Sequence, residues 1–210
     1  MLTQRLNPPF GSRLLPAFLL LLFTLPFLSG CGINTIPTQE EKAKAAWSEV
    51  LNQYQRRADL IPNLVETVKG YASQEKDVLT SVVEARAKAT QTQVNVNTPT
   101  NPEQFKAFQE GQAGLTGALS RLLAVVEAYP DLKSNQNFLA LQAQLEGTEN
   151  RIAVARRDYI EAVRLYNTSL RTFPTVLWAK YWYTDAKPFE NFTISEDKME
   201  LPKVDFGKKS

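Results

Sequence analysis

The 210-residue sequence contains no histidine and only one cysteine. Histidine is the side chain most often used as a general base near neutral pH and is the commonest metal ligand, so its absence excludes histidine-dependent triads and zinc sites. A single cysteine forms no internal disulfide, so a chain of this size must be held together by its apolar core. We therefore predict no metal site, no cofactor and no catalytic residue.

The chain also lacks a large excess of either charge, with 24 lysines and arginines against 22 aspartates and glutamates. Residues 1–30 hold two of the arginines and no acidic residue, so the remainder is formally neutral, with 22 of each sign. Proteins that bind nucleic acids gain affinity by neutralising phosphates and show a basic excess. We therefore expect no nucleic-acid partner.

The N-terminal segment has the pattern of an export signal. Arg5 and Arg13 precede a mostly apolar stretch at 14–27, which is followed by Leu28-Ser29-Gly30-Cys31. A positive leader, a short apolar segment and small residues before the cleavage point are typical of signal peptides. The pattern resembles a bacterial lipoprotein signal, in which Cys31 carries the lipid. We predict a lipoprotein-type signal peptide over 1–30, and an anchor and linker over 31–37.

Two other interpretations of this segment stay open. An uncleaved membrane span needs about 18 or more consecutive apolar residues, and this stretch is shorter and contains Pro16 and Pro26. A plain secretory signal would leave Cys31 as a free thiol. We expect a membrane-anchored protein that faces outside the cytoplasm, in the periplasm or at the outer membrane, with a single N-terminal transmembrane span as the alternative.

From Thr38 onward the sequence has the periodicity of long helices. Thr38 and Glu41 match a capping box, and Pro62 is expected to kink the first helix or mark a local opening in it. We predict a break at Gly70, with Ser73 as the N-cap of the next helix, rather than one uninterrupted helix. The apolar positions that recur by threes and fours are Trp47, Val50, Tyr54, Ala58, Ile61, Val65 and Val68.

Two more long helices are predicted after a loop at 91–102. Asn101 caps a helix over 102–129 with a proline in its first turn. The next helix starts from Ser134 or Asn135 and runs to about residue 170, with apolar residues repeating over roughly four heptads, as in helix bundles. The glycines of the 102–129 helix are spaced by three, which favours close helix packing, and they are Gly111, Gly114 and Gly117.

The predicted fold class is all-α. We expect an antiparallel up-and-down four-helix bundle with long helices over 38–186, followed by an aromatic-rich extended C-terminal tail over 187–210. Beyond Pro174 we expect a short helix and then a strap along the bundle. The simpler interpretation of the aromatic residues there is that they seal the end of the core. The alternative is a membrane-interface belt or a docking patch that includes Trp178 and Trp182.

Several polar residues near the apolar positions are candidates for binding or for fixing helix register. Asp59 and Glu149, with Arg57 as a possible partner, are expected to form helix-face ion pairs. Asn63 and Asn150 lie beside the apolar seam, where buried amides can fix the register of packed helices. An enzyme that uses only carboxylates would depend on Asp59 or Glu149, but we do not predict an enzyme.

Three runs of sequence occur in a fixed order: 56–72, 122–133 and 148–153. They closely resemble the three blocks of the LemA family of bacterial membrane-anchored proteins, and the resemblance covers about 45–206. It implies an all-helical up-and-down bundle and supplies no catalytic residue, because the family has no established biochemical activity. Family members usually carry an N-terminal membrane helix, where this chain has a lipoprotein-type signal.

These observations favour a membrane-anchored helical scaffold or protein-binding module of the bacterial cell envelope, with another envelope protein as its partner. The linker from Gly32 to Pro37 spans at most about 20 Å when extended, which keeps the bundle close to the lipid surface. The alternative function is a carrier of a small apolar ligand or lipid, which requires a cavity inside the bundle.

Overall fold

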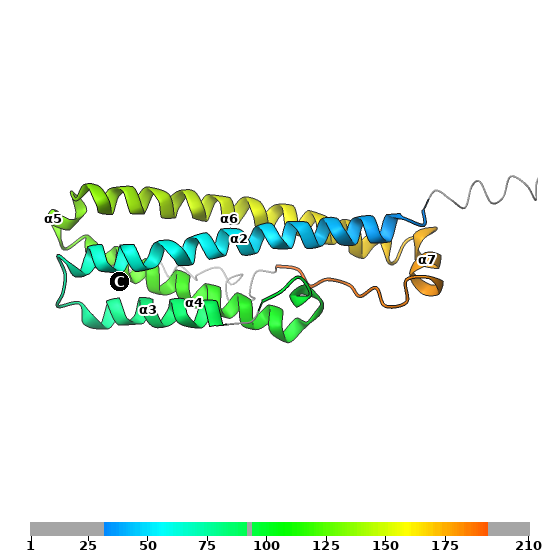
Figure 1. Ribbon diagram of the computed structural model, residues 1–210, viewed down its shortest axis with the longest axis horizontal. Coiled ribbons are helices and arrows are strands. Elements are labelled where there is room, and N and C mark those ends of the chain that lie inside the picture. The colour runs from blue at the N-terminus through cyan, green and yellow to red at the C-terminus, as the bar shows by residue number, and fades with distance from the viewer. Residues whose placement is uncertain (1–31, 92–93, 193–210) are drawn as a thin grey trace, which may run out of the picture.

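The computed structural model describes residues 32–91 and 94–192, and all regular structure in these ranges is helical (Figure 1). The predicted all-α class is therefore confirmed. The predicted signal peptide, Cys31 and the tail beyond residue 192 lie outside the described residues. The elements are α2 (Thr35–Lys69), α3 (Lys76–Gln91), the 3-10 turn η1 (Thr98–Thr100), α4 (Pro102–Val126), α5 (Pro130–Lys133), α6 (Gln136–Ser169) and α7 (Thr175–Tyr181).

The long helices form an elongated rod (Figure 1). The two longest, α2 and α6, pack side by side, α3 packs on α4, and α3 also touches α2. The start of α2 and the whole of α7 lie at one end of the rod, and α5 lies at the other (Figure 1). At 1.5 Å per residue, the 34 residues of α6 alone extend for about 50 Å.

Helix ends were predicted correctly where a side chain makes the cap. The amide oxygen of Asn101 accepts hydrogen bonds from the backbone N–H groups of Glu103 and Gln104, at 3.1 and 3.2 Å. Asn135 caps α6 in the same way. The break at Gly70 is also confirmed, because α2 ends at Lys69 and a turn separates it from α3.

Two predicted N-caps are wrong. α2 begins at Thr35, and the backbone N–H of Thr38 donates to Asn34 at 3.1 Å, so Thr38 lies inside the first turn. The additional residues include Ile36, which is fully buried in the core, and this burial stabilises the earlier start. Ser73 lies in the turn before α3, which begins three residues later.

Pro62 does not interrupt α2. The helix continues through this exposed proline to its end, so the local opening suggested by the sequence is absent. Its neighbours Ile61 and Leu64 are buried in the core and hold both sides of the helix in place. Tertiary packing therefore offsets the missing backbone hydrogen bond.

The buried apolar residues form two clusters along the rod. One lies toward α5 and includes Val68, Leu122 and Phe138. The other lies toward α7 and is rich in aromatic rings around Trp47. The described part of the predicted tail is extended and adds two buried rings to the second cluster, those of Phe189 and Phe192. These two rings seal the core as the sequence suggested.

The three glycines of α4 differ in their surroundings. A methyl group added at Gly111 would lie 3.3 Å from the Cα atom of Ala89, so close packing against α3 requires this glycine. Nothing lies within 4 Å of such a group at Gly114 or Gly117. The prediction of close packing is therefore correct for Gly111 and wrong for the other two.

Alanine substitutions at these glycines are expected to have opposite effects. Gly114→Ala and Gly117→Ala should each raise the free energy of unfolding by about 0.5–1 kcal/mol, because alanine has the higher helix propensity and the site is open. Gly111→Ala should lower it, because the backbone of α3 must shift. Urea unfolding of the three variants measures this, and stabilisation by Gly111→Ala would contradict the packing described.

Two fully buried tyrosines provide a matched pair for a second prediction. The hydroxyl of Tyr159 donates to the backbone oxygen of Glu190 at 2.6 Å, whereas the hydroxyl of Tyr166 has no partner among the described residues. Tyr159→Phe should lower the free energy of unfolding by about 1–2 kcal/mol, because it leaves a carbonyl unpaired. Tyr166→Phe should change it by less than about 0.5 kcal/mol or raise it. Equal effects in urea unfolding would contradict this assignment.

Burial of tyrosines also predicts the response to alkaline pH. Burial raises the pKa of Tyr166 to about 12 and raises the pKa values of Tyr54 and Tyr159. Since the folded state favours the protonated hydroxyls, their contribution is complete below about pH 10 and is lost as the pH rises through the folded pKa values. Each tyrosine should remove up to about 1.4 kcal/mol per pH unit above pH 10. Urea unfolding from pH 8 to 11 should show this slope, reduced in Tyr166→Phe.

Candidate functional site

Arg57 of α2 is a charged side chain buried between the two apolar clusters. Its Nη1 atom donates to Thr116 Oγ1 at 3.1 Å and to Glu149 Oε1 at 3.0 Å. Its Nη2 atom donates to the side-chain oxygen of Gln112 at 2.5 Å and to the backbone oxygen of the same residue at 3.4 Å. The guanidinium thus joins α2 to α4 and α6, and we call these four residues the Arg57 node.

The Arg57 node is dry on one side and open on the other. The guanidinium carbon lies 4.9 Å from the centre of the Tyr54 ring, which covers it within the core. The Glu149 side chain is 42% exposed, so the carboxylate connects the buried charge to solvent. Burying an arginine is costly unless its donors are paired; here both Nη atoms are paired, and the buried Nε atom has no partner among the described residues. The Arg57 node therefore stabilises the packing of α2 against α4 and α6, because only this packing brings the acceptors to the guanidinium. This is a structural role.

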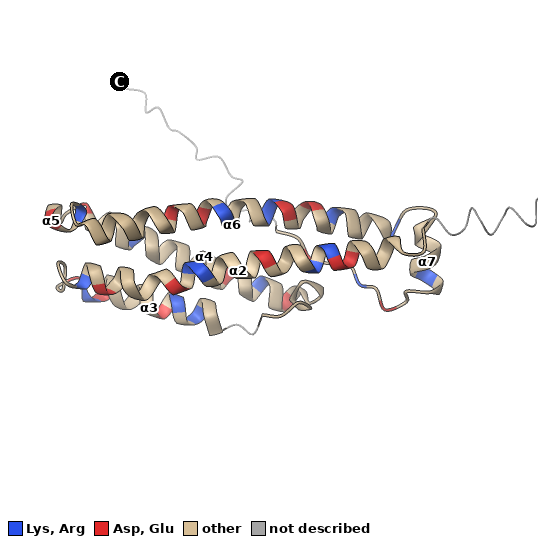
Figure 2. Cartoon of the chain, turned by 45° about the horizontal axis from the view of Figure 1, so that its top comes forward, with Lys and Arg blue, Asp and Glu red and all other residues tan. Residues whose placement is uncertain are grey.

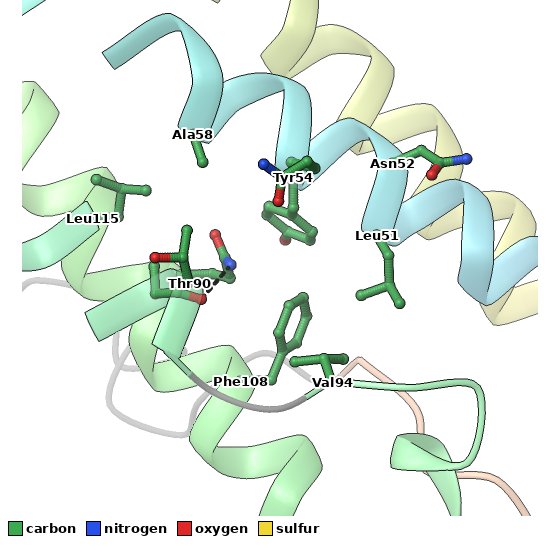
Figure 3. A pocket seen from close by; sticks show the side chains of 11 residues that line it. Leu51, Asn52, Tyr54, Ala58, Thr90, Val94, Phe108 and Leu115 are labelled. Carbon is green, nitrogen blue, oxygen red and sulfur yellow. Dashed lines mark hydrogen bonds between the residues drawn. The ribbon is translucent and has the colours of Figure 1, made fainter. Parts of the chain in front are cut away.

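A small pocket lies next to the node, between α2, the end of α3 and α4 (Figure 3). Its volume is about 260 Å³, slightly below the roughly 300–1,000 Å³ of ordinary ligand sites. Gln112 forms part of its wall and donates to the backbone oxygen of Ala89 at 3.5 Å. Exposed Asn52 and Gln55 also line it, so the pocket reaches the surface. Its apolar lining comes from Leu51, Tyr54, Ala58, Val94, Phe108 and Leu115.

A second hollow lies on the surface between α2 and α6, with a volume of about 460 Å³. We call it the α2–α6 groove. Asn63 and Thr67 of α2 face Asn137 and Gln144 of α6 across it. The side chain of Thr67 donates to the backbone oxygen of Asn63 at 2.8 Å. The remaining lining residues are Glu66, Ala140 and Leu141.

The predicted site residues do not gather in one place. Glu149 belongs to the Arg57 node, so it forms a contact between helices rather than the predicted pair on one helix face. Asp59 is exposed and accepts a hydrogen bond from Gln55 at 2.8 Å. Asn63 and Asn150 are exposed as well. The buried-amide interpretation of the two asparagines is therefore wrong, because both point away from the apolar seam; a binding role for them stays a prediction.

The two candidate tryptophans lie at the α7 end of the rod. Trp178 is half-buried against the aromatic cluster, whereas Trp182 is 68% exposed. Their rings meet edge to face with centres 5.8 Å apart. Gly32, the first described residue, packs here too, since a methyl group added to it would lie 3.4 Å from the Trp178 ring nitrogen. The chain therefore enters the rod beside α7.

Sequence reasoning treated Arg57 only as a possible surface partner and missed its burial. It also missed the burial of the polar residue Gln112. One signal was available for Arg57, because it follows Tyr54 by three residues and precedes Ile61 by four. This spacing places it on the apolar face of the helix. Gln112 carries the same kind of signal, because apolar residues lie four positions before it and three positions after it.

Two other kinds of feature are absent from the described ranges. None of their helices has both the length and the apolar character that crossing a bilayer requires. Within the same ranges, no three acidic or cysteine side chains lie close enough together to hold a metal ion.

Comparison with known proteins gives four relatives of low identity. Magnetosome protein MamQ 2 of Paramagnetospirillum magneticum is 28% identical over 157 residues, which cover 67% of this chain and 58% of that protein. Protein LemA of Metamycoplasma hominis is 23% identical over 142 residues, which cover 68% of this chain and 61% of that protein. The chain thus spans about three fifths of the length of these relatives.

The match to a family model is broader than any of these pairwise similarities. It begins at residue 46 inside α2, extends into the C-terminal tail and includes α3, α4, α6 and α7. It also includes all four residues of the Arg57 node. Because the LemA family model matches residues 46–206, well over half of the sequence, the chain belongs to the LemA family.

Proposed function

We propose that this protein is a membrane-anchored helical scaffold that binds another protein of the bacterial cell envelope and catalyses no reaction of its own. The observation that supports this most is the place where the chain enters the rod. Gly32 packs against α7, and the apolar stretch at 14–27 lies only a few residues before it. An anchor in that stretch or on Cys31 would hold one end of the rod at a membrane.

We further infer that α2, α3, α4 and α6 form the predicted up-and-down four-helix bundle. The contacts of α2 with α6 and of α3 with α4 support this arrangement. The Arg57 node supports it as well, because its acceptors come from two other long helices. A rigid bundle suits a scaffold, since a partner binding to it would not have to order it.

The anchor is proposed to be a lipid on Cys31. The relatives named as magnetosome proteins and as Protein LemA support a place at a membrane but do not distinguish a lipid from a span. The membrane-bound wild-type chain should lack residues 1–30 and show the added mass of a lipid on Cys31, whereas Cys31→Ala should carry no lipid. If the wild-type chain in the membrane keeps residues 1–30 and an unmodified Cys31, the single-span alternative is correct.

The partner is proposed to bind in the α2–α6 groove. The groove offers the side-chain amide groups of Asn63, Asn137 and Gln144 beside the apolar side chain of Leu141, and such a mixture is typical of protein interfaces. A photo-crosslinking residue at position 137, in cells with intact membranes, should capture one recurring envelope protein. The matched control is the same residue at Val83 of α3, which is exposed and outside the groove. Equal capture from both positions, or none, would contradict the groove as the binding site.

The carrier alternative is favoured by one observation, the pocket beside the Arg57 node. Its apolar wall is suited to part of an acyl chain or another small apolar molecule. If the protein is a carrier, protein purified from membranes in mild detergent would retain one ligand molecule per chain, which native mass spectrometry would detect. Leu51→Trp should fill the pocket and remove that ligand. A retained ligand without any crosslinked protein would favour the carrier over the scaffold.

A further inference from the structure

Four large apolar side chains are exposed together at the α7 end of the rod. Phe173 is 80% exposed, Leu177 is 47% exposed, and Tyr181 and Trp182 are each 68% exposed. We call these four residues the α7 apolar face. The other exposed large apolar residues in the described ranges are no more than 50% exposed; four are spread along α6, one lies on α3, and two lie in turns or loops. Clustered exposed apolar residues are typical of contact surfaces, whereas scattered ones are normal.

The orientation of α7 is fixed by the residues on its inner side. The buried hydroxyl of Thr175 donates to the backbone oxygen of Ser169 at 2.6 Å, which ties α7 to the end of α6. Trp178 packs inward on the aromatic cluster. Leu177 and Tyr181 are four residues apart and therefore share the opposite, outer side. The α7 apolar face is thus held outward by the fold.

The course of the chain indicates what covers this face. Gly32 is buried and packs next to Thr175 and Trp178 on α7. Residues 28–31 alone separate it from the apolar stretch at 14–27, and they span at most about 15 Å when extended. Whichever anchor is used, the lipid surface begins within this distance of α7.

Charge and residue type at this end match a lipid surface. Positions 171–187 hold three basic residues and one acidic residue, namely Arg171, Lys180 and Lys187 against Asp185. α7 itself carries a basic residue and no acidic one (Figure 2). Near α5, by contrast, acidic residues outnumber basic ones at 127–133 and at 66–77. Basic residues attract anionic headgroups, and Trp and Tyr are enriched where a membrane meets water.

We propose that the α7 apolar face inserts into the headgroup region of the membrane that holds the anchor. The proposal rests on the membrane anchoring inferred above and adds a second point of contact. Two contacts, the anchor and α7, fix which end of the rod touches the membrane. The α2–α6 groove begins near the other end of α2 and is left free for a partner.

Tryptophan quenching in vesicles tests this contact. The full chain is reconstituted in vesicles of phosphatidylethanolamine and phosphatidylglycerol that contain lipid with a nitroxide near the headgroup. The fluorescence of Trp182 is obtained as the difference between the fluorescence of the wild-type chain and that of Trp182→Phe. This difference should fall at least twofold when the nitroxide lipid is present. The matched control is Trp182→Phe with Leu139→Trp, because Leu139 is exposed near α5. The new tryptophan should show no quenching.

The other outcomes separate the possible failures. Flotation of the same vesicles reports whether the chain is anchored. A chain that floats while Trp182 is quenched no more than the tryptophan at 139 would overturn the α7 contact alone. A chain that does not float would overturn both the anchor and the contact. Iodide in the water phase quenches the fluorescence of exposed tryptophans. If iodide quenches Trp182 in vesicles but not in native membranes, a protein rather than lipid covers the α7 apolar face, and the lipid proposal is wrong.

Discussion

Replacing Trp47 by alanine is expected to lower the free energy of unfolding by about 4 kcal/mol, within the range measured for large aromatic residues in protein cores. The Trp47 side chain is fully buried. Its ring nitrogen donates to the backbone oxygen of Asn95 at 3.0 Å, which ties α2 to the segment before η1. The alanine variant loses this bond and leaves a cavity. Ring centres within 6.1 Å of the Trp47 ring belong to Phe105, Phe108, Tyr159 and Phe192.

The matched control for this prediction is Trp182→Ala. Trp182 is mostly exposed, so its loss should change the stability in detergent-free solution by less than about 0.5 kcal/mol. Urea unfolding followed by circular dichroism avoids the change in tryptophan signal. A loss of less than about 2 kcal/mol on replacing Trp47 would contradict the rigid aromatic cluster, because a well-packed core cannot close such a cavity without cost.

The second large effect is expected at the Arg57 node. Glu149→Ala should lower the free energy of unfolding by about 2 kcal/mol, because it leaves the buried guanidinium without its counter-charge. The loss stays below the 3–5 kcal/mol of fully buried pairs, since Gln112 and Thr116 still accept from the guanidinium. Arg57→Met keeps most of the volume and removes the charge, so it should change stability by about 1 kcal/mol or less.

The double variant separates the coupling energy between Arg57 and Glu149 from the interactions of each side chain with other residues. In the Arg57→Met background, Glu149→Ala should cost less than about 0.5 kcal/mol, since the exposed carboxylate then has no buried partner. The coupling of roughly 1.5–2 kcal/mol is obtained from urea unfolding of the four proteins. Additive effects in this cycle would show that the ion pair contributes nothing to the packing of α2 against α6.

Much of the fold could be predicted because its signals are local. The apolar periodicity places Tyr54 and Ile61 on one face regardless of the partner helix. Asn101 and Asn135 cap their helices with their own side chains, so their roles follow from neighbouring residues. The start of α2 differs, because the burial of Ile36 depends on contacts with distant residues. A capping pattern at Thr38 contains no information about such contacts.

Little of the candidate site could be predicted, because it depends on distances between helices. Burial of Arg57 is favourable only where acceptors from α4 and α6 meet its guanidinium. The sequence gives the face on which each residue lies but not the register of one helix against another. The error at Asn63 and Asn150 has a different cause, because both lie next to positions of the apolar face and one position along a helix turns a side chain by about 100°.

The central claim is that the chain before Gly32 holds the rod at a membrane. The measurement that tests it most directly is the partition of two proteins between membranes and the soluble fraction after a high-salt wash. One is the full chain, and the other begins at Gly32 and is exported by an unrelated cleavable signal. The full chain should remain in the membrane fraction, and the shorter chain should be released in folded form. Recovery of the full chain in the soluble fraction would contradict the claim.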